Sequence, residues 1–429
     1  MSEYLGYKKN SIEFLKRNQI SIGDTVDVFA DVRYSGIIMP RYEHSDDEHI
    51  VLKLRNGYNV GLEITKIQRI EKTQHAAKIV EKPGKIIKNK GLPKILLLST
   101  GGTIASKVDY RTGAVTPVLT AEELNSSVPE LTNIANIDAE VLFSEYSENI
   151  MPEHWLKIAE KITQYSKSDY VGIIIAHGTD TMHYTSAFLS FSLAGFPLPI
   201  ALVGSQRSSD RASSDAALNL VGAAKFIVEC KTKGIFVVMH QDENDETVAC
   251  HLGTRVRKNH TSKRGAFQTI GNNPAFLVVN NEIHKNMKNN FFTSKNFQPK
   301  IKLNEKVSLV KYYPGYDPNM LETIIDSGCK VIIFEGTGLG HIGKNMYSVL
   351  KKANEKGIFM GMTSQCIDGR VRMTVYESGR DLLNLGITSL ENMIPEVALV
   401  KSMWVSGNEE NYDRIKEIML NNIASEFST

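Results

Sequence analysis

Four apolar runs of strand length alternate with helix-like stretches through the middle of the chain, and this alternation constrains the fold most strongly. The runs are Lys94–Leu98, Val171–Ala176, Pro199–Val203 and Ile235–Met239. Stretches typical of helices, such as Pro152–Tyr165 and Asp215–Glu229, separate them. Each run is apolar throughout rather than at every second residue, so both of its faces are expected to be buried. The pattern predicts a doubly wound α/β domain, in which helices cover a parallel sheet.

A second unit of the same kind follows the polar stretch Asn289–Glu305. Its expected strands and helices alternate at Val307–Tyr312, Asn319–Ser327, Lys330–Phe334, Gly343–Lys356 and Ile358–Met362. The 429 residues exceed what one ordinary core needs, because a domain usually takes about 150 residues. We therefore expect one α/β domain over residues 93–300 and another over residues 301–429.

The first 75 residues have a different pattern. Short β-type runs lie at Thr25–Ala30, Gly36–Met39, Ile50–Leu54 and Tyr58–Ile64. Asn56-Gly57 supplies the positive-φ pair that a two-residue hairpin turn needs. The pattern predicts a small SH3-like β-barrel module over residues 1–75. Such a module serves equally well as a structural appendage or as a docking unit.

A basic segment joins this module to the α/β domains. From Thr65 to Lys94 there are nine basic residues and two acidic ones. We expect a basic linker over residues 76–92. Solvation of a linker explains this charge excess, and so does contact with RNA or a partner protein.

Composition argues against several classes of protein. The 50 basic and 48 acidic residues leave a net charge of +2, which gives no global attraction to nucleic acid. The four cysteines show no close pairing, so neither a zinc site nor a disulfide framework is indicated. The uncharged stretch Tyr184–Gln206 is interrupted by Gly195, Pro197 and Pro199, so we interpret it as a buried helix and a strand rather than a membrane span. The N-terminus lacks the apolar core of a signal peptide, and the expected compartment is the cytoplasm.

Two glycine–threonine turns follow two of the apolar runs. The first reads TGGT at residues 100–103, and the second reads HGTDT at residues 177–181. Ligands of open parallel sheets bind where the strands end. The two turns therefore predict one site that is built from two loops.

These turns carry the groups that acyl transfer needs. Gly102 lets the backbone turn sharply and present amide N–H groups to a developing oxyanion. Thr103 is a weak nucleophile on its own and requires a proton acceptor. Thr179 and Asp180 add a hydroxyl and a carboxylate, and a desolvated Lys258 is a base that could act on Thr179.

Each of these features also has a structural explanation. TGGT is compatible with a turn that starts a helix, and HGTDT with a helix N-cap. Lys258 fits a solvated basic loop that it shares with Arg255, Lys263 and Arg264. Tyr110 lies in a polar stretch that suits a mobile lid over Thr103, but a loop tyrosine needs no function.

In combination, the TGGTIA and HGTDT phrases and the lysine resemble the L-asparaginase and glutaminase family of amidohydrolases. The resemblance covers most of residues 93–429 and implies a two-domain asparaginase-like fold. It implies that Thr103 is the acylating nucleophile and Tyr110 its loop partner. It further implies that Thr179, Asp180 and Lys258 form a second catalytic set.

The same resemblance extends to substrate binding. Ser147 and Glu148 look like the family's loop that holds the α-carboxylate and α-ammonium of the substrate. Gly102 and Gly178 are counted with the substrate-binding residues, and no metal ligand is expected. Simple asparaginases complete the site with an acidic residue from a neighbouring subunit, and its equivalent has no assigned position here.

Several phrases point to one branch of the family, the asparaginase-like subunit of archaeal glutamyl-tRNA(Gln) amidotransferases. They lie at residues 204–215, 335–341 and 364–371. The β module before the linker is also similar. This resemblance implies a chain that hydrolyses glutamine and hands ammonia to an amidating partner subunit, which uses ATP and Mg²⁺ on Glu-tRNA(Gln). No cofactor is expected on this chain itself, and a homodimer core within a heterotetramer is implied.

Two other functions remain open at this point. One is a free-standing L-asparaginase with an extra β module, and the other is a non-catalytic scaffold that binds tRNA or protein. Asparagine and glutamine differ by one methylene, which a pocket distinguishes by only about 1–3 kcal/mol. The residues alone therefore do not choose between the two substrates.

Overall fold

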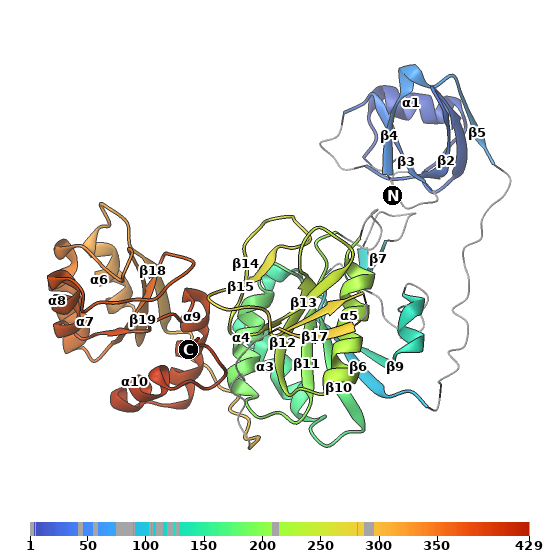
Figure 1. The fold of residues 1–429 in the computed structure, drawn as a ribbon. Helices are drawn as coiled ribbons and strands as arrows, with labels where there is room; N and C mark the ends of the chain where they lie inside the picture. Colours follow the sequence, from blue (N-terminus) through green and yellow to red (C-terminus); the bar gives the residue numbers. More distant parts are fainter. Residues whose placement is uncertain are drawn as a thin grey trace.

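The structure is a computed structural model of the chain. It describes residues 4, 6–41, 46–54, 59–73, 89, 91–102, 104, 106–108, 115–117, 124, 128–207, 214–280, 282–286 and 296–428. Figure 1 shows two α/β domains side by side and an N-terminal module that stands apart from both. The expected boundary at residues 75–76, most of the basic linker and the Asn56-Gly57 turn lie outside the described residues.

The N-terminal module contains one antiparallel sheet and a helix. Its elements are α1 (Lys9–Arg17), β1 (Thr25–Phe29), β2 (Arg33–Ile38), β3 (His49–Leu54), β4 (Asn59–Glu63), a 3-10 turn (Ile64–Lys66) and β5 (Arg69–Lys72). The strand order is β4-β3-β2-β1-β5. Leu15 of α1 packs with Val26, Ile38 and Leu52 of the sheet in one small core. The expected β-rich module is present, its closure into an SH3-like barrel stays a prediction, and α1 was not expected.

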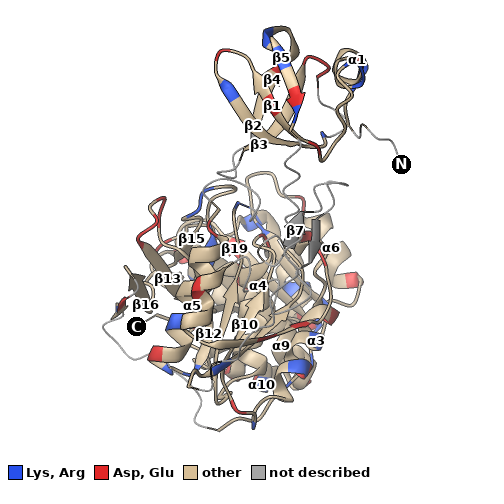
Figure 2. Cartoon of the chain, turned by 90° about the vertical axis from the view of Figure 1, so that its right-hand side faces the viewer, with Lys and Arg blue, Asp and Glu red and all other residues tan. Residues whose placement is uncertain are grey.

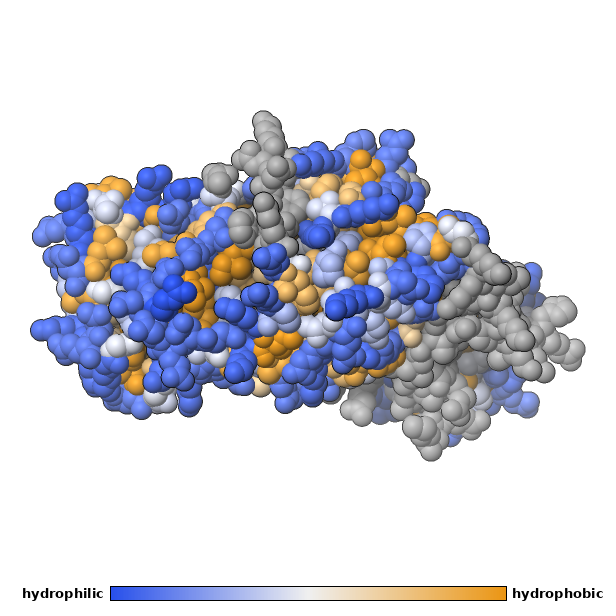
Figure 3. Space-filling model, turned by 90° about the horizontal axis from the view of Figure 1, so that it is seen from below, coloured by the Kyte–Doolittle hydropathy of each residue, from blue (hydrophilic) through white to orange (hydrophobic). Residues whose placement is uncertain are grey.

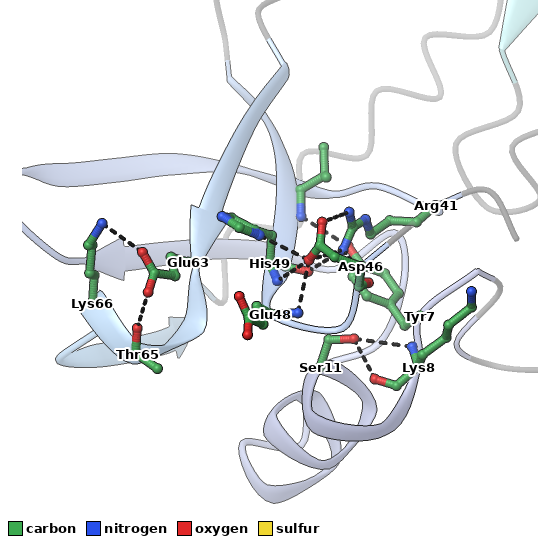
Figure 4. A network of polar contacts seen from close by, with 11 residues as sticks. Tyr7, Lys8, Ser11, Arg41, Asp46, Glu48, His49, Glu63, Thr65 and Lys66 are labelled. Atoms are coloured by element: carbon green, nitrogen blue, oxygen red, sulfur yellow. Dashed lines mark hydrogen bonds and ion pairs between the residues drawn. The ribbon is translucent and has the colours of Figure 1, made fainter. Parts of the chain in front are cut away.

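Asp46 lies just before β3 and binds both Arg41 and the start of that strand (Figure 4). Its carboxylate accepts hydrogen bonds from the backbone N–H groups of Glu48 (2.9 Å) and His49 (3.0 Å) and pairs with Arg41 at 2.8 Å. The hydrogen bond from Arg41, followed by the one from His49, holds the pKa of Asp46 well below its ordinary range. The buried hydroxyl of Tyr7 donates to Met39 O at 2.8 Å and so ties the N-terminal segment to the backbone just after β2.

The central domain is built on an eight-stranded sheet. Its strands are β6 (Lys94–Ser99), β9 (Asn136–Val141), β10 (Tyr170–Ala176), β11 (Pro199–Val203), β12 (Gly234–His240), β13 (Thr247–Leu252), β16 (Phe276–Val279) and β17 (Glu282–Lys285). The order is β17-β16-β13-β12-β11-β10-β6-β9. From β12 to β9 all neighbours are parallel, which confirms the doubly wound core of the sheet. The sheet as a whole is mixed, because β13, β16 and β17 extend it in antiparallel pairing, which the sequence pattern did not indicate.

Helices cover both faces of this sheet. They are α3 (Pro152–Thr163), α4 (Met182–Ser192) and α5 (Ala216–Cys230). Alternate residues of β6 face opposite sides: Leu96 and Leu98 share a core with α3 and α4, whereas Ile95 and Leu97 share one with α5. Burial on both faces is the reason these strands are apolar throughout. The uncharged stretch from Tyr184 forms most of α4 and then β11, as expected.

The C-terminal domain repeats the architecture on a smaller scale. Its elements are β18 (Val307–Lys311), α6 (Pro318–Asp326), β19 (Val331–Gly336), a 3-10 turn (Lys344–Met346), α7 (Tyr347–Glu355), β20 (Phe359–Ser364), α8 (Glu377–Asn384), β21 (Ile387–Ser389), α9 (Pro395–Asn408) and α10 (Tyr412–Leu420). The four strands are parallel in the order β18-β19-β20-β21. The strands and helices expected from the sequence are all present.

The two α/β domains share a hydrophobic core at their contact. Helix α4 of the central domain packs against α9, and the rings of Phe191 and Trp404 stack with their centroids 5.8 Å apart. Thr254 Oγ1 also donates to Ala424 O at 2.7 Å. One cluster of buried residues runs through α4, α9 and both sheets. The C-terminal domain therefore packs on the side of the central sheet that α3 and α4 cover.

The surface of the described residues mixes both signs of charge. Figure 2 shows lysines and arginines interspersed with acidic residues, consistent with the small net charge. On the face drawn in Figure 3, hydrophilic residues surround separate apolar patches. Among the helices that the structure describes, none has the length and hydropathy to cross a bilayer.

Candidate functional site

Three loops leave the central sheet at the same edge. Strands β6 and β10 are parallel neighbours, and Ser99 at the end of β6 lies opposite Ala176 at the end of β10. Beyond them Thr100 donates from its N–H and its hydroxyl to Ala176 O, each at 3.0 Å. On the other side of β6, the backbone after β9 joins the edge through Glu145 N–H, which donates to Thr100 O at 3.1 Å. The two predicted glycine–threonine turns are therefore side by side, with a third loop beside them.

Glycines allow these loops to touch. Gly102 has a φ of +80°, and a Cβ there would lie 2.7 Å from the backbone N of Gly178. A Cβ at Gly178 would in turn lie 2.7 Å from the Cβ of Ser147. Both distances are far shorter than a real Cβ contact. The three loops can therefore converge only because these positions have no side chain.

We expect Gly102→Ala to separate the loops. The substitution adds backbone strain at a positive φ to a clash with Gly178, so the free energy of unfolding should fall by about 2–4 kcal/mol. The amide hydrolysis that the family resemblance implies should fall with it, since the loop before Thr103 can no longer lie against Gly178. Gly328→Ala is the matched control: its φ of +84° carries the same strain, but no atom lies within 4 Å of the added Cβ. Equal activity in the two variants would contradict the conclusion that the contact between the Gly102 and Gly178 loops is needed for hydrolysis.

Thr103 and Tyr110, the predicted nucleophile and its loop partner, lie outside the described residues. The structure does describe the two residues that flank Thr103 in the chain. Gly102, which precedes Thr103 in the chain, lies against the HGTDT loop, and Ile104, which follows it, is buried.

Lys258 meets Thr179 and Asp180 at this edge. The lysine ends β14 (Val256–Lys258), which pairs with β15 (Phe267–Thr269) in a two-stranded sheet. Its Nζ donates to Thr179 Oγ1 at 2.9 Å and to Asp180 Oδ1 at 2.6 Å. The Lys258 side chain is 9% exposed, against 63% for Asp180. The explanation that Lys258 belongs to a solvated basic loop is therefore wrong.

Ser147 and Glu148 occupy the third loop, in the 3-10 turn Ser147–Asn149. Ser147 is buried, and its Oγ accepts a hydrogen bond from Asp180 N–H at 3.3 Å. Its carbonyl oxygen accepts from Thr181 Oγ1 at 2.7 Å. Glu148 is exposed. Ser147 thus fixes the HGTDT loop, while the Glu148 carboxylate is placed to meet solvent or a ligand.

Two buried histidines lie beneath the site, and neither was predicted to have a role there. His177 contacts Gly178 O through Nδ1 at 2.6 Å and Thr185 Oγ1 through Nε2 at 2.9 Å. Burial lowers the pKa of His177 to about 4. Burial, reinforced by the nearby cations Arg257 and Lys258, also lowers the pKa of His183 to about 4. Both rings are neutral at pH 7, so they add no positive charge beside Lys258.

The loop after β11 also lies at this edge. Residues 204–215 resemble a phrase of the family branch, but the sequence predicts no role for Asp215. Asp215 accepts hydrogen bonds from the backbone N–H groups of Gln206 (3.0 Å) and Arg207 (2.9 Å). A Cβ at Gly204 would lie 2.7 Å from Thr179 Cγ2, so this loop packs directly against Thr179. A signal for this loop in the sequence is Gly204, which directly follows the apolar run Pro199–Val203.

The described groups suit proton transfer at an alcohol. Lys258 lies between the hydroxyl of Thr179 and the carboxylate of Asp180. A hydroxyl in contact with an amine can lose a proton to it before attack, and the proton can then be returned to a leaving amine. Within the described ranges, no group of three or more histidine, cysteine or acidic side chains could hold a metal ion.

Three family models match the chain in order. They are the GatD N-terminal domain over residues 20–72, the N-terminal asparaginase domain over residues 94–291 and the glutaminase/asparaginase C-terminal domain over residues 306–419. They correspond in order to the N-terminal module, the central domain and the C-terminal domain.

Relatives of similar length share this arrangement. The GatD subunit of the Sulfolobus acidocaldarius glutamyl-tRNA(Gln) amidotransferase is 45% identical over 420 residues, which are 97% of this chain and 94% of that protein. The protein of the same name from Pyrococcus abyssi is 43% identical over 432 residues, 97% of each chain. The solved thermostable L-asparaginase from Thermococcus kodakarensis superposes with a TM-score of 0.70 at 31% identity and covers 78% of this chain and 99% of its own.

Proposed function

Because this chain belongs to the GatD family of glutamyl-tRNA(Gln) amidotransferase subunits, we propose that it is the subunit that hydrolyses glutamine and releases ammonia for amidation of Glu-tRNA(Gln). The observation that carries the proposal is the contact of Lys258 Nζ with Thr179 and Asp180 beside the converging Gly102 and Gly178 loops. Asparaginase-type chemistry acts on carboxamides, and glutamine supplies one.

The chemistry proceeds through an acyl-enzyme. Thr103 Oγ attacks the amide carbon of glutamine while the backbone N–H groups of its loop stabilise the oxyanion. The C–N bond then breaks, and the leaving nitrogen takes a proton and departs as ammonia. Water cleaves the resulting ester and releases glutamate. Thr179, Asp180 and Lys258 move the protons, Tyr110 assists Thr103, and Ser147 and Glu148 hold the α-carboxylate and α-ammonium of glutamine.

The ammonia has to reach a second active site. A GatE-like partner subunit would phosphorylate Glu-tRNA(Gln) with ATP and Mg²⁺ and replace the phosphate with ammonia, so this chain needs no cofactor of its own. We assign the assembly to the cytoplasm, with a homodimer of this chain at its core. The match to the Sulfolobus acidocaldarius amidotransferase subunit over 97% of the chain supports the complex, whereas the Thermococcus kodakarensis L-asparaginase covers 78% of the chain.

Coupling provides the test of this function. Glutaminase activity of the purified chain should rise at least about tenfold when the partner subunit and Glu-tRNA(Gln) are added, because ordering of loops by a partner commits the substrate only when ammonia can be used. Ammonia release from glutamine and from asparagine is measured with and without each component. Fast turnover of asparagine by the chain alone, unaffected by partner or tRNA, would favour a free-standing asparaginase. No amide hydrolysis under any condition would favour a scaffold.

A further inference from the structure

The strand that carries Lys258 is not part of the main sheet. β14 has three residues and pairs only with β15 among the described strands. Such a short hairpin does not hold its own position. Yet its last side chain has to place an ammonium or amine nitrogen within hydrogen-bond distance of Thr179. The position of β14 must therefore come from its other contacts.

One anchor is Arg255, directly before β14. Its side chain is fully buried, and Nη1 donates to Asn392 O at 2.7 Å and to Glu426 O at 2.8 Å. Nε donates to Ile270 O at 3.0 Å, just after β15. Arg255 thus ties both strands of the hairpin to segments of the C-terminal domain.

A second anchor is Arg257, the residue before Lys258. Its Nε lies 2.9 Å from Glu396 Oε1 in the first turn of α9, and the Glu396 side chain is 10% exposed. Burial raises the pKa of Glu396, and the charge of Arg257 opposes that rise. A carboxylate this buried is costly without its partner. The pair therefore holds β14 firmly to α9.

The Arg257–Glu396 pair connects the two parts of the site through helices α9 and α4. α9 packs along α4, and α4 begins directly after Thr181 of the HGTDT loop. Thr179 and Asp180 are therefore set by the N-terminus of α4, while Lys258 is set through Arg257 by the N-terminus of α9. Consecutive strand residues point to opposite faces, so the hold on Arg257 also fixes the direction of Lys258.

We propose that Arg257 and Glu396 are positioning residues, through which the C-terminal domain places Lys258 against Thr179. The proposal rests on the proposed function, because it takes Lys258 as part of the site. Neither residue contacts glutamine in this role. Loss of the pair lets β14 shift, and a displacement of about 1 Å between reacting groups costs about 100-fold in rate.

The test is a double-mutant cycle on the amidotransferase complex. Arg257→Gln, Glu396→Gln and the double variant are assayed for glutamine hydrolysis, with kcat and KM determined separately. Each single variant should lose about 10- to 100-fold in kcat with a KM within about threefold of the starting value. The double variant should be no slower than the slower single variant, since both changes remove one link. Arg257→Lys, which can still meet Glu396, should recover part of the loss.

Two controls separate positioning from general damage. Glu140→Gln breaks a partly buried ion pair with Lys161, 2.6 Å long, that has no contact with β14, and it should leave kcat unchanged. Lys258→Met tests the underlying function: full activity there overturns the assignment of Lys258 itself. The positioning role is wrong if Lys258→Met is inactive but the Arg257 and Glu396 variants keep the kcat of the starting chain or of the Glu140 variant. It is also wrong if the losses in kcat of the two single variants add in the double variant. In each of these cases the proposed function stands.

Discussion

The Lys258→Met variant is expected to hydrolyse glutamine about 1,000-fold more slowly than the unchanged chain, within the range that a proton-transfer group contributes. Methionine keeps the unbranched apolar stem of lysine and lacks only its terminal nitrogen position, so the packing of β14 is preserved. What disappears is the nitrogen that contacts Thr179 Oγ1 at 2.9 Å and Asp180 Oδ1 at 2.6 Å. The loss should appear in kcat rather than in KM, because the nitrogen acts on protons and not on binding.

Lys263→Met is the matched control. Lys263 is exposed in the turn that joins β14 to β15, so its replacement removes a charge from the same hairpin without touching Thr179. Its activity should equal that of the unchanged chain. A similar loss in both variants would mean that the charge of the hairpin, and not the contact with Thr179, governs the rate.

The folded chain should be strongly destabilised by acid between pH 6.5 and 4. Burial lowers the pKa of His177 and His183 to about 4 and that of His251 to about 3. In the unfolded chain a histidine titrates near pH 6.5, so in this window the unfolded state binds protons that the folded state excludes. The free energy of unfolding therefore falls as the pH falls. Each histidine contributes on the order of 3 kcal/mol by pH 4, and the three together approach the whole stability of an ordinary domain.

Urea titrations at pH 7 and at pH 4.5 measure this loss. His251→Gln removes one of the three buried rings and should lessen the pH dependence by about 2–3 kcal/mol. The comparison is His284→Gln, on the exposed strand β17, which should leave the pH dependence as it was. If His251→Gln loses as much stability between pH 7 and pH 4.5 as the unchanged chain does, the ring is protonated in the folded state at pH 4.5.

Much of the fold follows from local sequence because the parallel strands are buried on both faces. Continuous apolar runs such as Val171–Ala176 have few other uses in a soluble domain. The antiparallel extension was missed, because β16 and β17 are four-residue strands whose pairing depends on neighbours rather than on their own pattern. Helix α1 was missed because its sequence, KNSIEFLKR, has no acidic residue in its first turn and buries little besides Leu15.

The sequence could predict those parts of the site whose residues directly follow a strand. The TGGT and HGTDT turns follow β6 and β10, and parallel pairing puts such turns side by side. Contacts between distant segments were not predictable in this way. Arg255 and Asn392 are 137 residues apart, and nothing around either residue indicates the other. The neutral histidines were missed because their protonation depends on burial, which only the folded chain defines.

The anchoring of the Lys258 hairpin has a consequence for biosynthesis. Arg255 finds one of its acceptors, the carbonyl of Glu426, 171 residues later in translation. Until that segment emerges from the ribosome, the arginine keeps its hydration and the hairpin lacks its final support. The hairpin that carries Lys258 therefore reaches its final support only after a segment translated 171 residues later has folded against it.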